Sequence, residues 1–422
     1  MDWKVFASII FTLRRHDLDK SLWSRGECFG TAAVGTILEL CFRDPEHRSL
    51  LSTLRMTRSF KSTLPSDKIY ALLNLVSESE KKNIRVDYTC DASLVYKDFA
   101  VRHMQQQHSL DILYHCFKSK TASPLKPPSW TLDWTIPCWH EPFIYHGLNF
   151  GVAGDSTPDF WFDENGEIMY VRGKILDEVA GVKKLRVIPR ADAEPNDSEQ
   201  LGSLPFWRSP PTDKPWFKRR GGGKPYWEST HENYLEESRE NRREWINNVF
   251  AMAFPQKACT PEQFECLWRT FMRDTTIDGL LPPPEYGEYF SDWLIQVTAT
   301  QGEVDRHWRS RKAASMNLDL RELPGDEDPF TEWTKNCIAF GQANARCYNR
   351  RFYRSVAGRY GWGVDAMEAG DQICLFYGAC VPIILRQTDE GFYEIIGDAY
   401  LHGLMHGQGM TSEFEERIFQ LV

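Results

Sequence analysis

Apolar side chains recur at helical spacing through the first third of the chain, separated by short polar and turn-prone stretches. Residues three and four apart share one face of a helix, so this spacing predicts amphipathic helices. We therefore expect residues 1–123 to be mainly helical. The helices predicted in this region span residues 3–13, 31–42, 46–56, 65–76 and 92–104.

Residues 58–76 contain the clearest of these patterns, a polar lead-in followed by a short amphipathic helix. Pro65 fits the first helical turn, where its missing N–H needs no partner. Asp67 places a negative charge at the positive end of the helix dipole. One apolar stripe follows at i, i+3, i+4 and i+7, and we expect all of its members to pack in a core: Ile69, Leu72, Leu73 and Val76.

A second helix start follows residues 86–91, where either Thr89 or Asp91 is expected to act as the N-cap. Residues 110–116 continue the apolar pattern as a short strand or a last helical turn. The predicted core face of the helix consists of Leu94, Val95, Phe99 and Met104.

The pattern changes at Pro124, after which prolines disfavour a helix. Residues 127–134 form a rigid aromatic segment in which Trp130 and Trp134 flank Asp133. Two tryptophans at this spacing more often anchor a loop to a core than bind a ligand, and we predict the anchoring role.

Strand patterns appear in two places. In residues 160–176, apolar and polar side chains alternate, and the segment contains Asn165-Gly166, a pair that favours a hairpin turn. Four short apolar runs near the C-terminus are each ended by a turn, which predicts a small antiparallel β-barrel or curled sheet. These runs are residues 352–356, 370–377, 381–386 and 392–397.

The segments between the strands complete an α+β fold, with a helical N-terminal half, a β-hairpin, long loop insertions and the C-terminal barrel or sheet. Residues 189–230 lose the apolar pattern and predict a long loop or disordered insertion. Further helices are predicted at residues 232–250, 264–271, 287–299 and 330–347. We expect five regions: 1–123, helical; 124–188, a Trp-rich linker and hairpin; 189–231, an insertion; 232–347, helical; and 348–422, a small antiparallel β domain.

Composition narrows the class of protein. A chain of 422 residues with 42% hydrophobic side chains can bury a large core. It has no apolar run of membrane-spanning length, and residues 5–11 lack the flanks of a signal peptide. Its 11 cysteines include no Cys-x-x-Cys pair, which predicts reduced thiols rather than a zinc or redox site. We expect a soluble cytoplasmic protein with no metal and no cofactor.

Charge argues against a general nucleic-acid binder, because the net charge is −9 and phosphate affinity comes from clustered cations. Residues 216–227 are an exception, because they mix cations with aromatic residues, a composition typical of single-strand binding. The acidic residues around this segment disfavour that interpretation.

The usual catalytic patterns are missing, with no nucleophile elbow, no His-Glu-x-x-His and no Gly-x-Gly-x-x-Gly. His402 and His406 have the spacing of a helical metal pair but lack the intervening glutamate and a third ligand. Ordinary polar packing is the expected role of both histidines.

Two further sets of charged residues are predicted to be structural. Asp67, Lys68 and Arg58 are expected to provide a helix-capping carboxylate with a surface ion pair rather than an acid–base group. Asp371 follows Gly370 and is expected to be a turn residue that enters a strand. No residue is assigned a catalytic role.

Five stretches, in this order, resemble the fungal heterokaryon-incompatibility (HET) protein family, and we call them the family blocks. The first block, residues 58–76, carries Arg with Pro-x-Asp-Lys and Tyr-Ala-Leu-Leu, and the second, residues 87–100, carries Asp-Tyr followed by Val-Tyr. The third, residues 128–134, is Pro-Ser-Trp-x-x-Asp-Trp, and the fourth, residues 350–386, carries Arg-Arg-Phe with Gly-Asp-Gln-Ile-Cys and Val-Pro-Ile-Ile-Leu-Arg. The fifth, residues 393–403, carries Tyr-Glu-Ile-Ile-Gly-Asp-Ala-Tyr with His-Gly.

The chain departs from the family pattern at two points. Leu64 stands where the family commonly has Asp, so Thr63 must cap the helix or the cap is lost, at about 0.5–2 kcal/mol. The HET domain proper, an α/β unit likened to Toll/interleukin-receptor domains, has no counterpart in the sequence. Met1 falls roughly where that domain is expected to have ended.

The resemblance implies a non-enzymatic role in fungal non-self recognition and in the cell death that follows fusion of unlike strains. Recognition, regulation or antagonism is the expected role, and other proteins of the incompatibility system are the expected partners. An enzyme or accessory factor of fungal specialised metabolism is the alternative, because 15 Trp and 25 Phe could line an apolar pocket. A scaffold or nucleic-acid binder acting through residues 216–227 is a third hypothesis.

Overall fold

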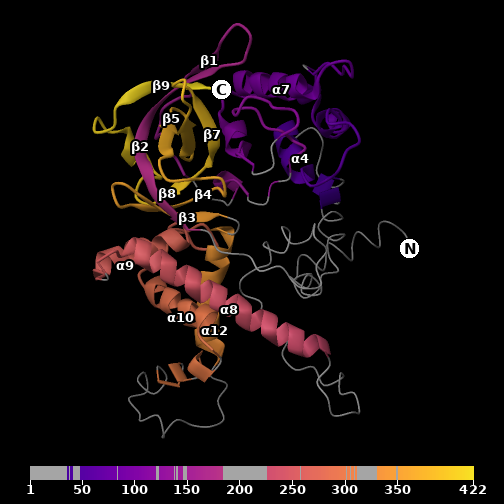
Figure 1. Cartoon of the computed structure of the whole chain (residues 1–422). Coiled ribbons are helices and arrows are strands. Elements are labelled where there is room, and N and C mark those ends of the chain that lie inside the picture. The colour runs from indigo at the N-terminus through magenta and orange to yellow at the C-terminus, as the bar shows by residue number, and fades with distance from the viewer. Residues whose placement is uncertain are drawn as a thin grey trace. The chain divides into compact units, whose positions relative to one another are not determined.

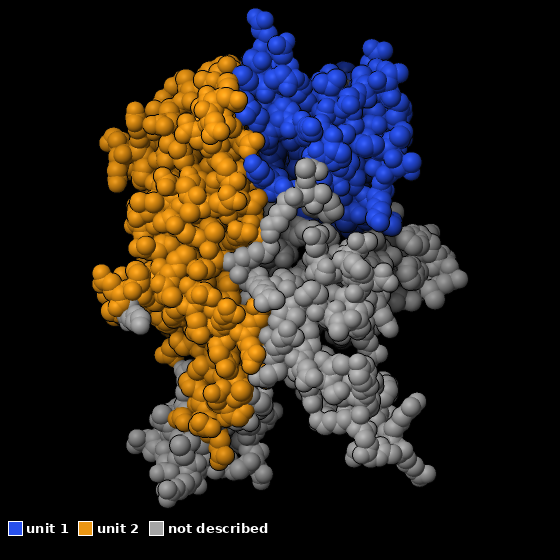
Figure 2. Space-filling model, in the orientation of Figure 1, with its two compact units in different colours: residues 1–138, 162–169, 422 blue, residues 139–161, 170–421 orange. Residues whose placement is uncertain are grey.

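A computed structural model describes residues 36–37, 39–40, 48–82, 84–119, 123–136, 138, 141–145, 150–183, 226–256, 258–300, 302–304, 306–307, 309–310, 330–347 and 350–422. The chain divides into two compact units, coloured separately in Figure 2. Unit 1 comprises residues 1–138, 162–169 and 422, and unit 2 comprises residues 139–161 and 170–421. Mixed helices and strands confirm the predicted α+β class (Figure 1).

Several predicted segments lie outside the described residues. They are the helix at residues 3–13, most of the helix at 31–42, the insertion at 189–225 with most of the basic aromatic segment 216–227, and residues 311–329. The five-region division of the chain stays a prediction.

Unit 1 is built from short helices around one long one, α7. Asp91, one of the two predicted caps, accepts the Ser93 N–H at 2.7 Å and so starts α7. Leu94, which was predicted to lie on the core face of α7, is instead 50% exposed. The described helices are α4 (Leu50–Thr57), α5 (Asp67–Tyr70), η2 (Leu73–Leu75), α6 (Glu78–Lys81), α7 (Ala92–Gln107) and η3 (Asp111–His115).

The predicted helix over residues 65–76 is wrong in its continuity, because α5 ends at Tyr70 and a separate 3-10 turn, η2, follows. The Leu72 N–H donates to the Ile69 carbonyl at 3.0 Å and the Leu75 N–H to the Leu72 carbonyl at 2.8 Å, so the i−4 bonds of α5 give way to i−3 bonds. The Leu75 carbonyl, beyond this change, accepts a hydrogen bond from Arg48 Nη1 at 2.7 Å. No side chain caps α5, so the cap expected from Thr63 is lost. Of the four predicted core residues, Ile69, Leu73 and Val76 are buried, whereas Leu72 is only partly buried.

Unit 2 contains a group of helices and a sheet. Residues 260–263 start α9 with a reciprocal capping box, in which Thr260 and Gln263 each accept the other's backbone N–H. The first of these helices begins at Tyr226, six residues before its predicted start. The helices are α8 (Tyr226–Ala253), α9 (Pro261–Phe271), α10 (Tyr286–Thr298), α12 (Phe330–Asn344) and the 3-10 turns η4 (Phe143–Tyr145), η7 (Ala345–Cys347) and η8 (Gln408–Met410).

An aromatic cluster fills the helical side of unit 2, and Phe271, at the end of α9, lies at its centre. Its ring centroid lies 5.1 Å from that of Phe290 on α10 and 6.0 Å from that of Trp293. It also lies 5.7 Å from Phe352 and from Trp362. All five side chains are buried, so this part of the aromatic content serves as core.

The sheet of unit 2 is organised by one long strand, β2, which curves through the sheet in Figure 1. β2 pairs with β5 in one half and with β3 in the other, with a register shift in each half. Bulges of this kind let a strand bend from one partner to the next. The strands are β1 (Phe160–Phe162), β2 (Met169–Lys183), β3 (Arg351–Ser355), β4 (Tyr360–Gly363), β5 (Gln372–Phe376), β6 (Ile383–Gln387), β7 (Tyr393–Asp398), β8 (Tyr400–Leu401) and β9 (Glu416–Leu421).

The strand pairings form a closed circuit, β2–β5–β6–β7–β9 and back to β2, which confirms the predicted barrel or curled sheet. β3, β4 and β8 extend from β2 outside this circuit, so the whole sheet is not a regular barrel. The antiparallel prediction fails at one pair, because β7 and β9 run parallel. The predicted hairpin is also not a separate element, because its second strand, β2, is part of the C-terminal sheet.

The sequence pattern missed β4, β8 and β9. Gly361 and Gly363 in β4 weaken the strand pattern, and yet each is needed for close packing. A Cβ on Gly361 would lie 2.2 Å from the Tyr400 carbonyl oxygen, and one on Gly363 would lie 2.7 Å from Met367 Sδ.

Candidate functional site

Arg58, the first residue of the first family block, is buried in unit 1 rather than placed in a surface ion pair as predicted. Its Nε donates to the Ile136 carbonyl at 3.0 Å. Its guanidinium lies 4.9 Å from the Phe117 ring centroid and 5.5 Å from that of Trp134. Burial lowers the pKa of Arg58, and nearby Asp133 is among the groups that oppose this shift. Arg58 thus ties the first block to the tryptophan block.

Lys68 and Asp67 make separate contacts, so the structure does not join them in an acid–base group. Lys68 Nζ donates to the carbonyl oxygens of Arg58, at 2.9 Å, and Phe60. Burial, followed by the nearby Arg58 charge, lowers the pKa of Lys68. Asp67 Oδ1 accepts the Tyr88 hydroxyl at 2.9 Å, which joins the first block to the second.

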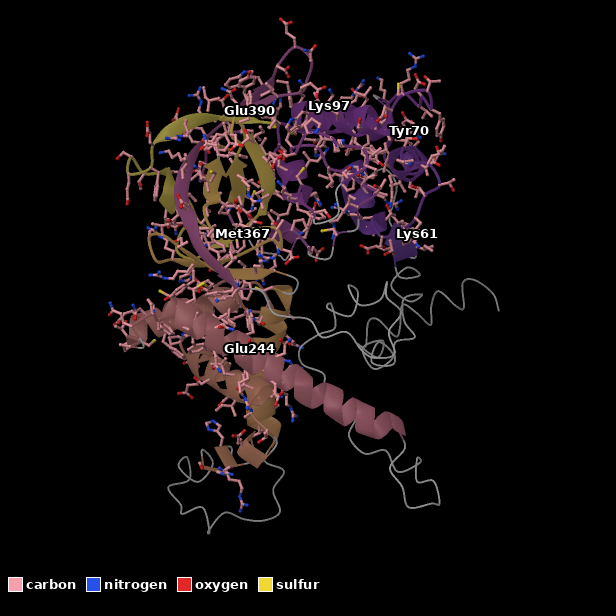
Figure 3. All side chains as sticks on the ribbon, in the orientation of Figure 1. Lys61, Tyr70, Lys97, Glu244, Met367 and Glu390 are labelled. Atoms are coloured by element: carbon pink, nitrogen blue, oxygen red, sulfur yellow. The ribbon has the colours of Figure 1, made fainter. Side chains whose placement is uncertain are left out.

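The Trp130–Trp134 segment anchors a loop in unit 1. Both indoles are buried, and Trp130 Nε1 donates to the Glu167 carbonyl at 3.3 Å. Asp133 accepts the backbone N–H and the hydroxyl of Thr135 at 2.8 and 2.6 Å. Lys97, labelled in Figure 3, forms an ion pair with Glu167 in the same unit.

Unit 2 contains a fully buried ion pair between Arg350 and Asp398, two family-block residues 48 positions apart. Arg350 Nη1 and Nη2 donate to the two carboxylate oxygens at 2.6 and 3.0 Å. Asp398 Oδ2 also accepts the Phe143 N–H at 2.9 Å, and Arg350 Nη2 donates to the Glu141 carbonyl at 2.7 Å. The guanidinium stacks 3.9 Å from the Phe143 ring centroid, so the pair fixes the 141–143 segment to the end of β7.

A second ion pair joins Asp371 to Arg386. Asp371 is at a turn before β5, as predicted, but it is also 2% exposed and bound by Arg386 Nε and Nη2 at 2.7 and 2.9 Å. Its Oδ2 accepts the Glu368 N–H at 2.8 Å. The hydrogen bonds that Arg386 donates to the Asp371 carboxylate raise the pKa of Arg386, so the guanidinium stays charged. No sequence pattern indicated Arg386 as the partner of Asp371, because the two residues lie 15 positions apart.

His402 and His406 make separate contacts. His402 Nδ1 lies 2.9 Å from Tyr400 Oη, and burial lowers the pKa of this histidine. The His406 ring lies 5.7 Å from the Phe150 ring centroid. Within the described ranges, no three His, Cys, Asp or Glu side chains are grouped in a way that could hold a metal ion.

The family blocks share one property. Their charged and aromatic side chains, as described above, contact other segments of the same unit. Three blocks meet in unit 1 through Arg58, Asp67 and Trp134. In unit 2 the Arg350–Asp398 pair joins the last two blocks, and the Asp371–Arg386 pair lies within the fourth block. Short Arg- and Asp-containing motifs were the only sequence signal for these centres. The pairing could not be read from the sequence, because each partner comes from a separate segment.

Among the helices that the structure describes, none combines the length and the apolar character needed to cross a bilayer.

Comparison with known proteins gives one match. Residues 333–422, from α12 to the C-terminus, match the family model of the Het-6 beta-barrel domain. Searches of the curated proteins and of the solved structures found no significant match. The matched segment contains β3–β9 and both buried ion pairs, but it excludes β2, which completes the strand circuit. The C-terminal part of this chain is thus similar to the Het-6 beta-barrel domain, and over this segment the match confirms the predicted resemblance to the heterokaryon-incompatibility family.

Proposed function

We propose that this chain acts in fungal heterokaryon incompatibility, where it binds other proteins of the system and regulates or antagonises the cell death that follows fusion of unlike strains. The observation that carries the proposal is the match of residues 333–422 to the Het-6 beta-barrel domain. The proposed site of action is the cytoplasm, where the contents of fused cells mix.

The geometry of the family blocks supports a binding role. Arg350, Asp398, Asp371 and Arg386 are used to hold strands and loops together. Aromatic residues that could have lined a pocket pack ring to ring around Phe271. The family blocks thus stabilise the fold, and residues outside them would contact a partner protein.

Expression in a fungal strain tests the proposal. The chain would be produced alone and together with an intact HET-family effector, and the surviving fraction of fused cells would be counted under a microscope with a vital dye. We expect no killing by the chain alone and a changed frequency of death when the effector is present. Robust killing by the chain alone would contradict regulation or antagonism.

A fluorescent tag on the same chain provides two controls. It reports protein level, so that a weak effect is not confused with low expression, and it reports location, which we expect to be cytoplasmic. An unchanged death frequency at matched expression, with several effectors, would remove the incompatibility role itself.

A further inference from the structure

The loop between α9 and α10 of unit 2 carries the two most exposed large apolar side chains among the described residues. Leu280 and Leu281 are 66% and 73% exposed, and Ile277 is 39% exposed. Isolated exposed leucines are common on protein surfaces, but here three large aliphatic residues are exposed within five positions of one short loop, which we call the apolar tip.

The backbone of this loop is held in one conformation. The Thr276 N–H donates to the Leu280 carbonyl at 2.8 Å, and the Leu280 N–H donates to Thr276 Oγ1 at 3.2 Å. Gly279 closes the turn at a φ of 82°, a region that glycine adopts without strain. The loop therefore holds its leucines in solvent without needing to be ordered on binding, which lowers the entropic cost of association.

The base of the loop is anchored as well. Pro282 is buried, and its carbonyl accepts a hydrogen bond from Arg269 Nη1 at 3.2 Å. Arg269 also pairs with Glu265 and Asp274, at 2.8 and 2.7 Å. The Arg269 guanidinium thus makes these contacts within unit 2, and two carboxylates already balance its charge.

The charge beside the apolar tip has one sign. Asp278 and Glu285 flank the leucines and are exposed, with Glu288 one helical turn further along α10. The sequence contains no Lys or Arg from position 275 to 305. An anionic membrane surface is disfavoured by this charge, because it carries the same sign.

We infer that the apolar tip Ile277–Leu280–Leu281 with Asp278 and Glu285 is a docking surface for a partner protein segment that presents leucine-like side chains flanked by lysine or arginine. Apolar contact supplies the affinity, and the carboxylates select for cations and against acidic segments. The inference rests on the proposed function for its biological setting, because it names the surface through which this chain would bind a protein of the system.

A peptide-binding experiment with the full chain tests the inference. The probe is a fluorescein-labelled helical peptide with leucines at i, i+3, i+4 and i+7 and lysines elsewhere, and its counterpart has glutamates in place of the lysines. Fluorescence anisotropy is expected to show binding of the Leu/Lys peptide that weakens with added salt, and much weaker binding of the Leu/Glu peptide.

Two variants separate the apolar and the charged contributions. Leu280→Ser with Leu281→Ser is expected to weaken Leu/Lys peptide binding by about tenfold or more, as for other interface anchor residues. Asp278→Lys with Glu285→Lys is expected to reverse the preference between the two peptides. Val356→Ser is the matched control, because Val356 is 62% exposed elsewhere in unit 2.

The result that overturns the inference is equal binding of the Leu/Lys peptide by the Leu280/Leu281 variant and the Val356 control. General attraction of a cationic peptide to a chain of net charge −9 would produce that result. A peptide preference that survives the charge reversal would also overturn it. If the chain binds the Leu/Lys peptide as expected but does not change the death frequency in the fungal fusion assay, the docking surface stands and the incompatibility role is rejected.

Discussion

Asp398→Asn is the substitution that most directly tests how the β domain is held together. It keeps the shape of the side chain and removes its charge, which leaves the Arg350 guanidinium charged and fully buried. Removing one partner of a buried ion pair generally costs about 3–5 kcal/mol, because the remaining charge has no compensation and no water. The upper part of this range is expected, because Asp398 also accepts the Phe143 N–H at 2.9 Å. The corresponding fall in melting temperature is roughly 10 °C.

Urea unfolding of the full chain, followed by tryptophan fluorescence, measures this loss. Asp98→Asn is a suitable control, because Asp98 pairs with Arg102 at 2.8 Å on the surface and should cost at most about 1 kcal/mol. Arg350→Met combined with Asp398→Leu removes both charges and should recover most of the stability lost by the single variant. A loss below about 1 kcal/mol for Asp398→Asn, or no recovery in the double variant, would refute the assignment of a desolvated pair.

Three further results are expected. Burial and the Arg58 charge lower the pKa of His115 from 6.5 to about 3, so the unfolded state binds more protons below pH 6.5. Stability is then complete above that pH and falls as the pH drops; by pH 5 the loss is about 2 kcal/mol, and His115→Gln should remove it from urea midpoints measured at pH 7.5 and 5. Gly173→Ala places a Cβ 2.2 Å from a β5 carbonyl oxygen and should lower the melting temperature, whereas Gly151→Ala, with open space around it, should not. Burial raises the pKa of Cys116 to about 12, so mass spectrometry should find it protected from iodoacetamide while the exposed Cys90 is alkylated.

Sequence reasoning was most successful where local chemistry decides the structure. The Asp91 cap, the Asn165-Gly166 turn and the apolar stripe of α9 each depend on residues close together in the chain. The predicted helix over residues 65–76 failed because spacing does not show where regular helix geometry ends, and at Leu72 the hydrogen bonds change from i−4 to i−3. Leu94 was misplaced for a related reason, because helical spacing shows which residues share a face and not how wide the covered face is.

The order of the family blocks, the α+β class and the four main C-terminal strands were determined by the sequence itself. These features follow from spacing and from short motifs, which tertiary contacts did not override. The role of the blocks was decided only by the tertiary structure, because Arg350 meets Asp398 across 48 residues and β2 reaches β5 from nearly 200 residues away in the chain. A pattern along the chain records which side chains are apolar or charged, but the partner of a buried charge is fixed by the fold that desolvates both groups.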